Sequence, residues 1–230
     1  MICFLFAMAK ECVPLLKEVE VMNEKEFGYT KVYEVRKEGS EFLIAVSGIG
    51  KAFAAASIPA IVAHYEVDAF FNIGVAGSQD KSKADIFSCV IGSSYVEHDL
   101  DSSALGDPKG MVSGIDLVSL PSSKLGMHQV ATACDALNIP HTFGVISSGD
   151  TFIADKQKKK EVTELFGSLS LDMESAPFAQ IAYVYHVPYV SARVISDAEH
   201  PETEYLENVE EASKRASKIA LQIALHCINR

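Results

Sequence analysis

Residues 69–77 read Ala-Phe-Phe-Asn-Ile-Gly-Val-Ala-Gly. The run from 69 to 74 is almost wholly apolar and ends in a glycine-rich turn, a pattern typical of a strand buried on both faces of a sheet. Similar apolar runs, each next to a segment of helical periodicity, occur before and after it. This alternation predicts an α/β fold with a central, twisted, mostly parallel sheet and helices on both faces.

The same reasoning extends along the chain. The turn Lys37-Glu38-Gly39-Ser40 predicts a hairpin, which makes the sheet mixed. Residues 97–121 are polar and predicted to be irregular, and with no linker in view we expect a single domain over residues 1–230. Further strands are expected at 2–9, 29–36, 42–46, 86–96, 142–147, 168–173 and 188–195, and helices at 10–19, 52–64 (with Pro59 expected to kink it or delay its start), 125–137, 156–165, 175–185 and 206–229.

Charge limits the classes of partner. The chain has 31 acidic and 20 basic residues and a net charge of -11. Such an acidic protein is not expected to bind nucleic acid or an anionic membrane. The only basic run, formed by Lys156, Lys158, Lys159 and Lys160, is interpreted as the solvated first turns of a helix.

The cysteine pattern and the apolar runs indicate a cytoplasmic protein. The five cysteines are scattered without a CxxC pair, which favours reduced thiols over disulfides or a zinc site. Residues 2–9 are too short and lack the basic start of a signal peptide, and no run is long enough to span a bilayer. The cysteines are Cys3, Cys12, Cys89, Cys134 and Cys227.

Carboxylates and glycine turns follow most of the predicted strands. Ligands of such sheets bind beyond the carboxyl ends of the strands, so these side chains are candidates for one site. Each signal alone has a plainer interpretation: Glu11 and Glu174 suit helix N-termini, and Asp197 suits a turn. The turn 48–51 lacks the spacing of a phosphate or dinucleotide loop, and it favours a close backbone approach to a small ligand.

Together, seven segments resemble the nucleosidase branch of the purine nucleoside phosphorylase superfamily over about residues 2–200. The resemblance implies a nucleoside phosphorylase-like three-layer sandwich and hydrolysis of the N-glycosidic bond of a 5′-substituted adenosine, without a cofactor. The segments are Ala7-Met8 with Glu11, Ser47-Gly48-Ile49-Gly50-Lys51, Gly74-Val75-Ala76-Gly77, His98-Asp99-x-Asp101, Ser148-Gly149-Asp150-x-Phe152-Ile153, Met173-Glu174 and Arg193-x-Ile195-Ser196-Asp197.

The resemblance also implies roles for the residues. Asp197, oriented by Ser196, would protonate the imidazole ring of the purine, Glu11 would hold or activate water, and Glu174 would bind ribose hydroxyls. Arg193 is either a brace for the water-side carboxylates or a structural ion-pair partner. The remaining contacts implied are Phe152 stacked on adenine, the Ile153 backbone at the adenine edge, Met173 on the sugar face, Ala76 and Gly77 along the nucleoside, and Ile49 near the 5′ group.

In that family a second subunit completes the 5′ pocket, so we expect a homodimer in which Ser102 and Leu105 face the partner. A metal at His98, Asp99 and Asp101 is not expected. Two departures are Asp172, where a glutamate is common, and Val75, where some relatives have serine. After Asp197 the usual aromatic lid is replaced, and either Tyr205 or Leu206 is expected to take its place.

Three alternatives stay open at this stage. A phosphorylase would split the same bond with phosphate, but no arginine lies near the glycine turns in sequence, and Glu11 would repel an anion. A hydrolase specific for aminodeoxyfutalosine would differ only in its 5′ pocket. A nucleoside-binding protein without chemistry would need neither acid.

Overall fold

The computed structural model describes residues 1–227; the side chain of Cys227 and the end of the helix expected to reach residue 229 lie outside the described part. The strands are β1 Ile2–Phe6, β2 Glu20–Phe27, β3 Thr30–Lys37, β4 Ser40–Val46, β5 Ala69–Ser78, β6 Cys89–Glu97, β7 Leu120–Pro121, β8 His141–Ser148, β9 Ser168–Asp172 and β10 Tyr189–Asp197. The helices are α1 Ala9–Leu16, α2 Lys51–Val62, α3 Lys124–Ala136, α4 Lys156–Phe166, α5 Ser175–Val184, α6 Pro201–Cys227 and the short 3₁₀ turn Ser103–Leu105.

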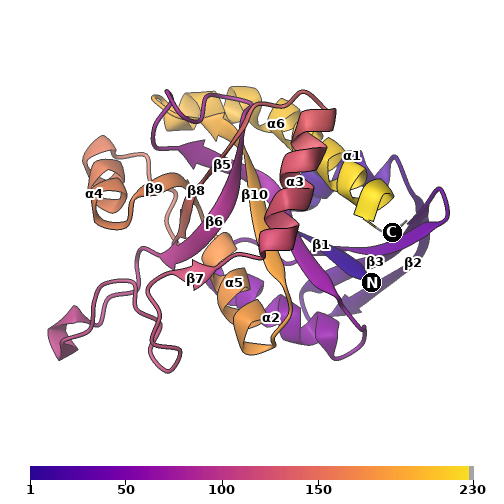
Figure 1. The fold of residues 1–230 in the computed structure, drawn as a ribbon, viewed down its shortest axis with the longest axis horizontal. Helices are drawn as coiled ribbons and strands as arrows, with labels where there is room; N and C mark the ends of the chain where they lie inside the picture. Colours follow the sequence, from indigo (N-terminus) through magenta and orange to yellow (C-terminus); the bar gives the residue numbers. More distant parts are fainter. Residues whose placement is uncertain (228–230) are drawn as a thin grey trace.

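One mixed sheet runs through the molecule (Figure 1). β1, β4, β5 and β10 are parallel neighbours, and β6, β8 and β9 form a second parallel group. β10 pairs with both β5 and β6, while β9 returns to pair antiparallel with the end of β5, so part of the sheet closes on itself. This closure brings the carboxyl ends of β5, β8, β9 and β10 to one place.

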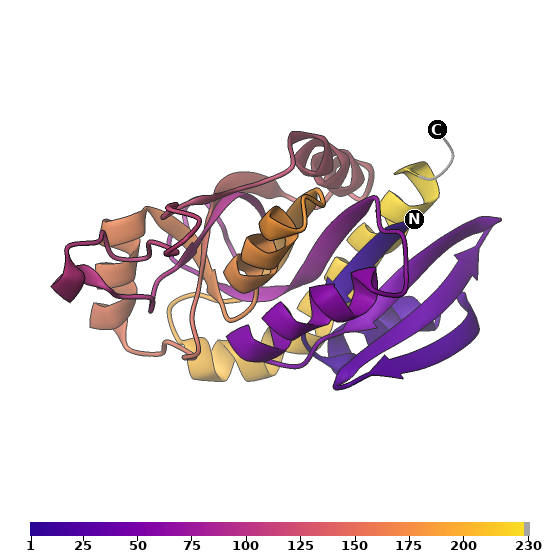
Figure 2. The same ribbon diagram turned by 90° about the horizontal axis from the view of Figure 1, so that it is seen from below.

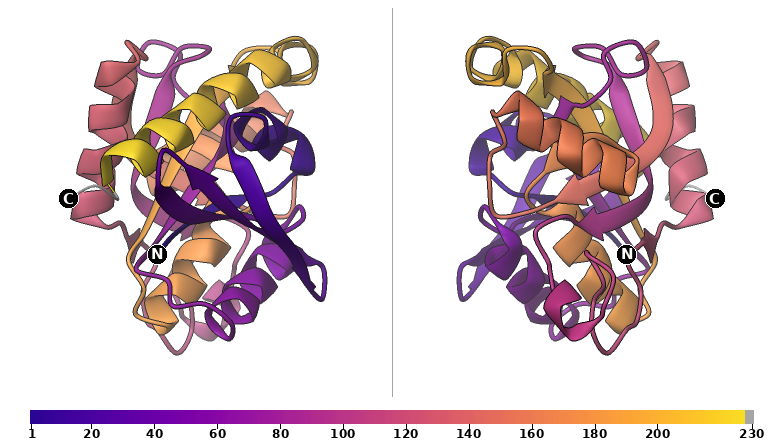
Figure 3. Two further views of the ribbon diagram at one scale, coloured as in Figure 1. Left: turned by 90° about the vertical axis from the view of Figure 1, so that its right-hand side faces the viewer. Right: turned by 90° about the vertical axis from the view of Figure 1, so that its left-hand side faces the viewer.

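Helices cover both faces of the sheet, as the sequence predicts. α2 and α5 pack on one face, and α1, α3 and α6 pack on the other (Figures 2 and 3). Successive strand residues alternate between these layers: Phe4 and Phe6 join the cluster under α1 and α6, whereas Cys3 and Leu5 join the cluster under α2 and α5. The apolar run of β1 is therefore buried on both sides, which explains its lack of polar alternation.

The elements differ from the sequence prediction in several places. β2 was not expected because its residues are nearly all exposed; its pairing with β3 extends the hairpin into three strands. α6 begins at Pro201, five residues early, since proline suits the first turn of a helix and Glu202 and Glu204 favour that turn. α2 runs through Pro59 to Val62.

No helix in residues 1–227 combines the length and apolar character that crossing a bilayer requires. Within the same residues, no group of three or more His, Cys, Asp or Glu side chains is arranged to hold a metal ion.

Candidate active site

A cavity of about 230 Å³ lies at the carboxyl ends of the central strands. Glu11, Glu174 and Asp197, which are far apart in the sequence, all line it. The structure thus brings the three predicted acids to one site. Its other lining residues are Ala7, Met8, Ile49, Val75, Ala76, Gly77, Phe152, Leu171, Asp172, Met173, Ser196 and Tyr205.

Glu11 lies in the first turn of α1 and is only 1% exposed. Its carboxylate accepts hydrogen bonds from the backbone N–H of Met8 at 3.0 Å and of Val75 at 3.2 Å. Burial raises its pKa above the ordinary value, and the nearby Arg193 charge and the two N–H donors partly offset that rise. The side chain is a fixed carboxyl whose affinity for a proton is increased, as a general base requires.

Glu174 follows β9 and precedes α5. The backbone N–H of Gly50 donates to its carboxylate at 2.9 Å, so the glycine turn after β4 and the acid after β9 are directly joined. Burial, together with the neighbouring Asp172 charge, raises the pKa of Glu174 to about 8.

Asp197 ends β10 and is 3% exposed. The Ser196 hydroxyl donates to its Oδ1 at 2.8 Å, the orienting contact expected from the sequence. Burial raises its pKa, against the lowering effects of the Ser196 hydrogen bond and the Lys159 charge. A Cβ atom at residue 77 would lie 2.7 Å from Asp197 Oδ2, so Gly77 is what allows β5 to pass beside this acid.

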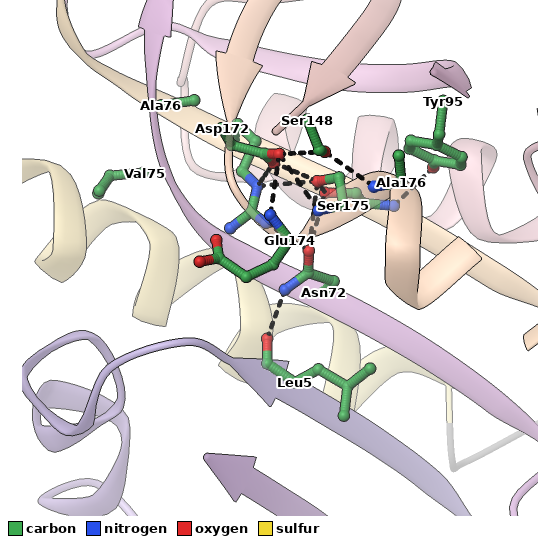
Figure 4. A network of polar contacts seen from close by, with 12 residues as sticks. Leu5, Asn72, Val75, Ala76, Tyr95, Ser148, Asp172, Glu174, Ser175 and Ala176 are labelled. Atoms are coloured by element: carbon green, nitrogen blue, oxygen red, sulfur yellow. Dashed lines mark hydrogen bonds and ion pairs between the residues drawn. The ribbon is translucent and has the colours of Figure 1, made fainter. Parts of the chain in front are cut away.

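A buried network of polar side chains adjoins the acids and holds Asp172 in place (Figure 4). Arg193 Nε donates to Asp172 at 2.7 Å and to the Ser175 hydroxyl at 3.1 Å, and its Nη2 donates to Asn72. Asp172 also accepts hydrogen bonds from Ser148 and Ser175. The shorter acid at position 172 thus reaches this network, and Figure 4 shows the Glu174 carboxylate extending away from it.

The far end of the cavity continues into a space of about 40 Å³ lined by Ile153 and Phe152, where the adenine contacts were expected. Tyr205 lines the main cavity; its ring meets that of Phe152 edge to face at 5.8 Å, and its hydroxyl accepts a hydrogen bond from Lys10. Leu206 is 77% exposed and does not line either space. Of the two lid candidates, only Tyr205 lies at the site.

Three predicted residues line neither the main cavity nor the adjoining space of about 40 Å³. Arg193 is buried behind it, where it forms the ion pair with Asp172. Ser102 and Leu105 lie on the segment between β6 and β7, which projects from the body of the molecule (Figure 1), and Leu105 is 87% exposed. Both residues were predicted to face the second subunit of a homodimer, near the 5′ pocket.

Sequence reasoning missed Lys159. It was interpreted as part of a solvated basic run, which is wrong for this residue: it is 9% exposed, and its Nζ lies 3.8 Å from Asp197 Oδ2. The missed signal is helical spacing, because Lys159 shares a face of α4 with the largely buried Val162 and Phe166.

A profile described as the phosphorylase superfamily matches residues 1–229. The chain belongs to the phosphorylase superfamily.

Individual members of the superfamily are similar over nearly the whole chain. A Staphylococcus aureus protein named 5′-methylthioadenosine/S-adenosylhomocysteine nucleosidase is 29% identical over 205 residues, 89% of each chain. The structure of the Neisseria meningitidis nucleosidase of the same name, in complex with methylthio-immucillin-A, has a TM-score of 0.91 at 26% identity and covers 96% of this chain and 97% of its own. Futalosine hydrolase of Helicobacter pylori has a TM-score of 0.90 at 25% identity, with 96% of each chain covered.

The raised pKa of Glu174 predicts a pH dependence of stability. The pKa of about 8 in the folded chain exceeds the ordinary 4.5, so Glu174 binds a proton more tightly in the folded than in the unfolded state. The resulting contribution to the free energy of unfolding is fully present below about pH 4.5 and is lost as pH rises through about 8. We expect Glu174→Gln to reduce the slope of unfolding free energy against pH in this window by up to about 1.4 kcal/mol per pH unit, measured by urea unfolding. Glu207→Gln, at an exposed glutamate, is the control, and an unchanged slope in Glu174→Gln would contradict the assignment.

Proposed function

We propose that this chain is a nucleosidase that hydrolyses the N-glycosidic bond of 5′-methylthioadenosine, S-adenosylhomocysteine or a related 5′-substituted adenosine, releasing adenine and the 5′-substituted ribose. The observation that carries the proposal is the convergence of Glu11, Glu174 and Asp197 in one cavity. The names of the relatives agree with this chemistry.

On the base side, Asp197 is the general acid. It gives its proton to the imidazole-ring nitrogen of adenine as the bond from C1′ to N9 breaks and its electron pair moves to the base. Such an acid must hold its proton near neutral pH, and the burial that raises the pKa of Asp197 supplies this property. Phe152 stacks on the base, and the Ile153 backbone pairs with its edge.

On the sugar side, Glu11 takes a proton from water as the water oxygen bonds to C1′. The negative charge of Glu11 also stabilises the positive charge that develops on the ribose. Glu174 binds ribose hydroxyls, Met173 lies along the sugar face, and Met8, Ile49 and Tyr205 border the 5′ group.

The nearest rival reaction uses phosphate instead of water. The main cavity is lined by four carboxylic acids and, among the described residues, by no lysine, arginine or histidine. Glu11 must be ionised to take a proton from water, and its negative charge would repel an entering anion; Arg193, which lies beside Gly74, is already paired with Asp172. These observations support hydrolysis.

The first test is therefore adenine release from 5′-methylthioadenosine with and without phosphate. We expect equal rates in a phosphate-free buffer and in one with added phosphate, followed by the absorbance change on adenine release. Activity that requires phosphate would make the chain a phosphorylase.

The second candidate is cleavage of aminodeoxyfutalosine, favoured by the structural similarity to futalosine hydrolase. It requires the same acids and differs only at the 5′ group. A panel of 5′-methylthioadenosine, S-adenosylhomocysteine, 5′-deoxyadenosine and aminodeoxyfutalosine, compared by kcat/KM, decides which substrate is preferred.

The assigned acids predict how variants behave. We expect Asp197→Asn and Glu11→Gln each to lower kcat by about 10²–10⁴-fold, because each removes one proton transfer, while adenine still binds in calorimetry. Asp135→Asn, at an exposed position of α3, serves as the control with unchanged kcat. A rate near that of the wild type in either cavity variant would remove that residue from the mechanism.

We also propose a homodimer in the cytoplasm, whose partner completes the 5′ side through Ser102 and Leu105. Support comes from the exposure of Leu105 and from the packed rings of Tyr29 and Phe53, 4.4 Å apart and exposed beside the 47–50 turn at the cavity.

Leu105→Asp tests the dimer. A charge in an apolar contact is expected to shift the protein to the monomer in sedimentation and to raise KM for 5′-methylthioadenosine about 10-fold. Leu125→Asp, another exposed leucine, should change neither quantity. A wild-type protein that sediments as a monomer would refute the proposal.

A further inference from the structure

Lys159 is a buried cation that the mechanism above does not use. Its ammonium group lies 3.8 Å from Asp197 Oδ2 and 3.4 Å from the Ala198 carbonyl oxygen, to which it donates. The side chain lines the small space next to the adenine end of the cavity. It therefore approaches the general acid from the predicted adenine end of the site.

The same lysine also lines a separate cavity of about 450 Å³. The walls of this second cavity include Lys156, Lys160, Glu164 and Glu199, which are all exposed, so it opens to solvent. Lys159 is the residue with a charged side chain that borders both this cavity and the space beside Asp197. A path from solvent to the acid thus passes through one ammonium group.

The proposed reaction creates a need for such a path. Each turnover moves a proton from Asp197 to the departing base and another from water to Glu11, so the enzyme ends with Asp197 ionised and Glu11 protonated. Glu11 must release a proton to solvent and Asp197 must regain one. Asp197 is 3% exposed, and in the proposed complex the adenine base lies against it, so bulk water has little access to the acid while the base is bound.

We propose that Lys159 returns the proton to Asp197: the ammonium gives a proton to the carboxylate, and the resulting neutral amine takes one from water in the second cavity. This inference rests on the proposed hydrolysis. The transfer requires the two groups, 3.8 Å apart, to come within hydrogen-bond distance. In this role Lys159 acts on the reaction through Asp197.

The surroundings make this exchange energetically feasible. Burial lowers the pKa of Lys159 and raises that of Asp197, so the two proton affinities approach one another. The negative charge of Glu204 raises the pKa of both groups. Glu204 lies at the start of α6, where it accepts hydrogen bonds from the backbone N–H groups of Ala198 and His200. The other charged groups facing the second cavity are Lys156, Lys160, Glu164 and Glu199.

Three variants distinguish the loss of proton return from the loss of a positive charge and from a structural change. Lys159→Met removes the relay. Because the enzyme starts with Asp197 protonated, this variant should release a rapid burst of about one adenine per site. Its later turnovers should be at least about 10-fold slower than those of the wild type, with KM unchanged. Lys159→Arg keeps the charge but cannot give up its proton at neutral pH, and the same slow steady state is expected. Lys160→Met, on the same helix and wall, should behave as the wild type.

Chemical rescue supplies a second measurement if the arginine does not fit. Added methylamine is expected to restore steady-state turnover in Lys159→Ala but not in Asp197→Asn. The inference is overturned if Lys159→Arg turns over like the wild type, if the first turnover is slowed as much as later ones, or if amines give no rescue. A wild-type enzyme that releases no adenine from any substrate in the panel would instead refute the proposed function.

Discussion

The buried ion pair of Arg193 and Asp172 is the interaction on which the site depends. It joins β10 to the end of β9, and through Asn72 and Ser175 it reaches β5 and the start of α5. A buried guanidinium left without its carboxylate costs several kcal/mol, typically about 3–5 kcal/mol, so these four elements are held in one arrangement. Glu174 and Asp197 are each within a few residues of that pair, and their positions follow from it.

The same burial that holds the acids also sets their chemistry. Glu11, Glu174 and Asp197 are removed from water, and the loss of hydration favours the proton-bearing form of each. Backbone N–H groups and the Arg193 charge then moderate Glu11, whereas the Asp172 charge adds to the rise at Glu174. The same functional group, a carboxyl, thus acquires different tasks from its neighbours.

Much of the fold and site could be predicted from residues alone because both follow local rules. Apolar runs gave the buried strands, helical spacing gave the covering helices, and the strand-end rule pointed to Glu11, Glu174 and Asp197. The sequence did not predict β2 because an exposed, polar strand has no apolar pattern to detect. The burial of Lys159 was not predicted because a lysine in a basic run is usually solvated. Only the packing of α4 beside Asp197 shows that this lysine is buried.

The sequence by itself determined the order of the buried strands and of the helices that cover them, and which acids follow those strands, since these depend on the chemistry of neighbouring residues. Only the tertiary structure decided that β10 pairs with both β5 and β6, that Arg193 faces Asp172 rather than the cavity, and that Tyr205 rather than Leu206 covers the site. Each of these is a contact between residues distant in the chain. The rotation of a helix or the partner of a strand is set by the packing of the whole core, which no local pattern contains.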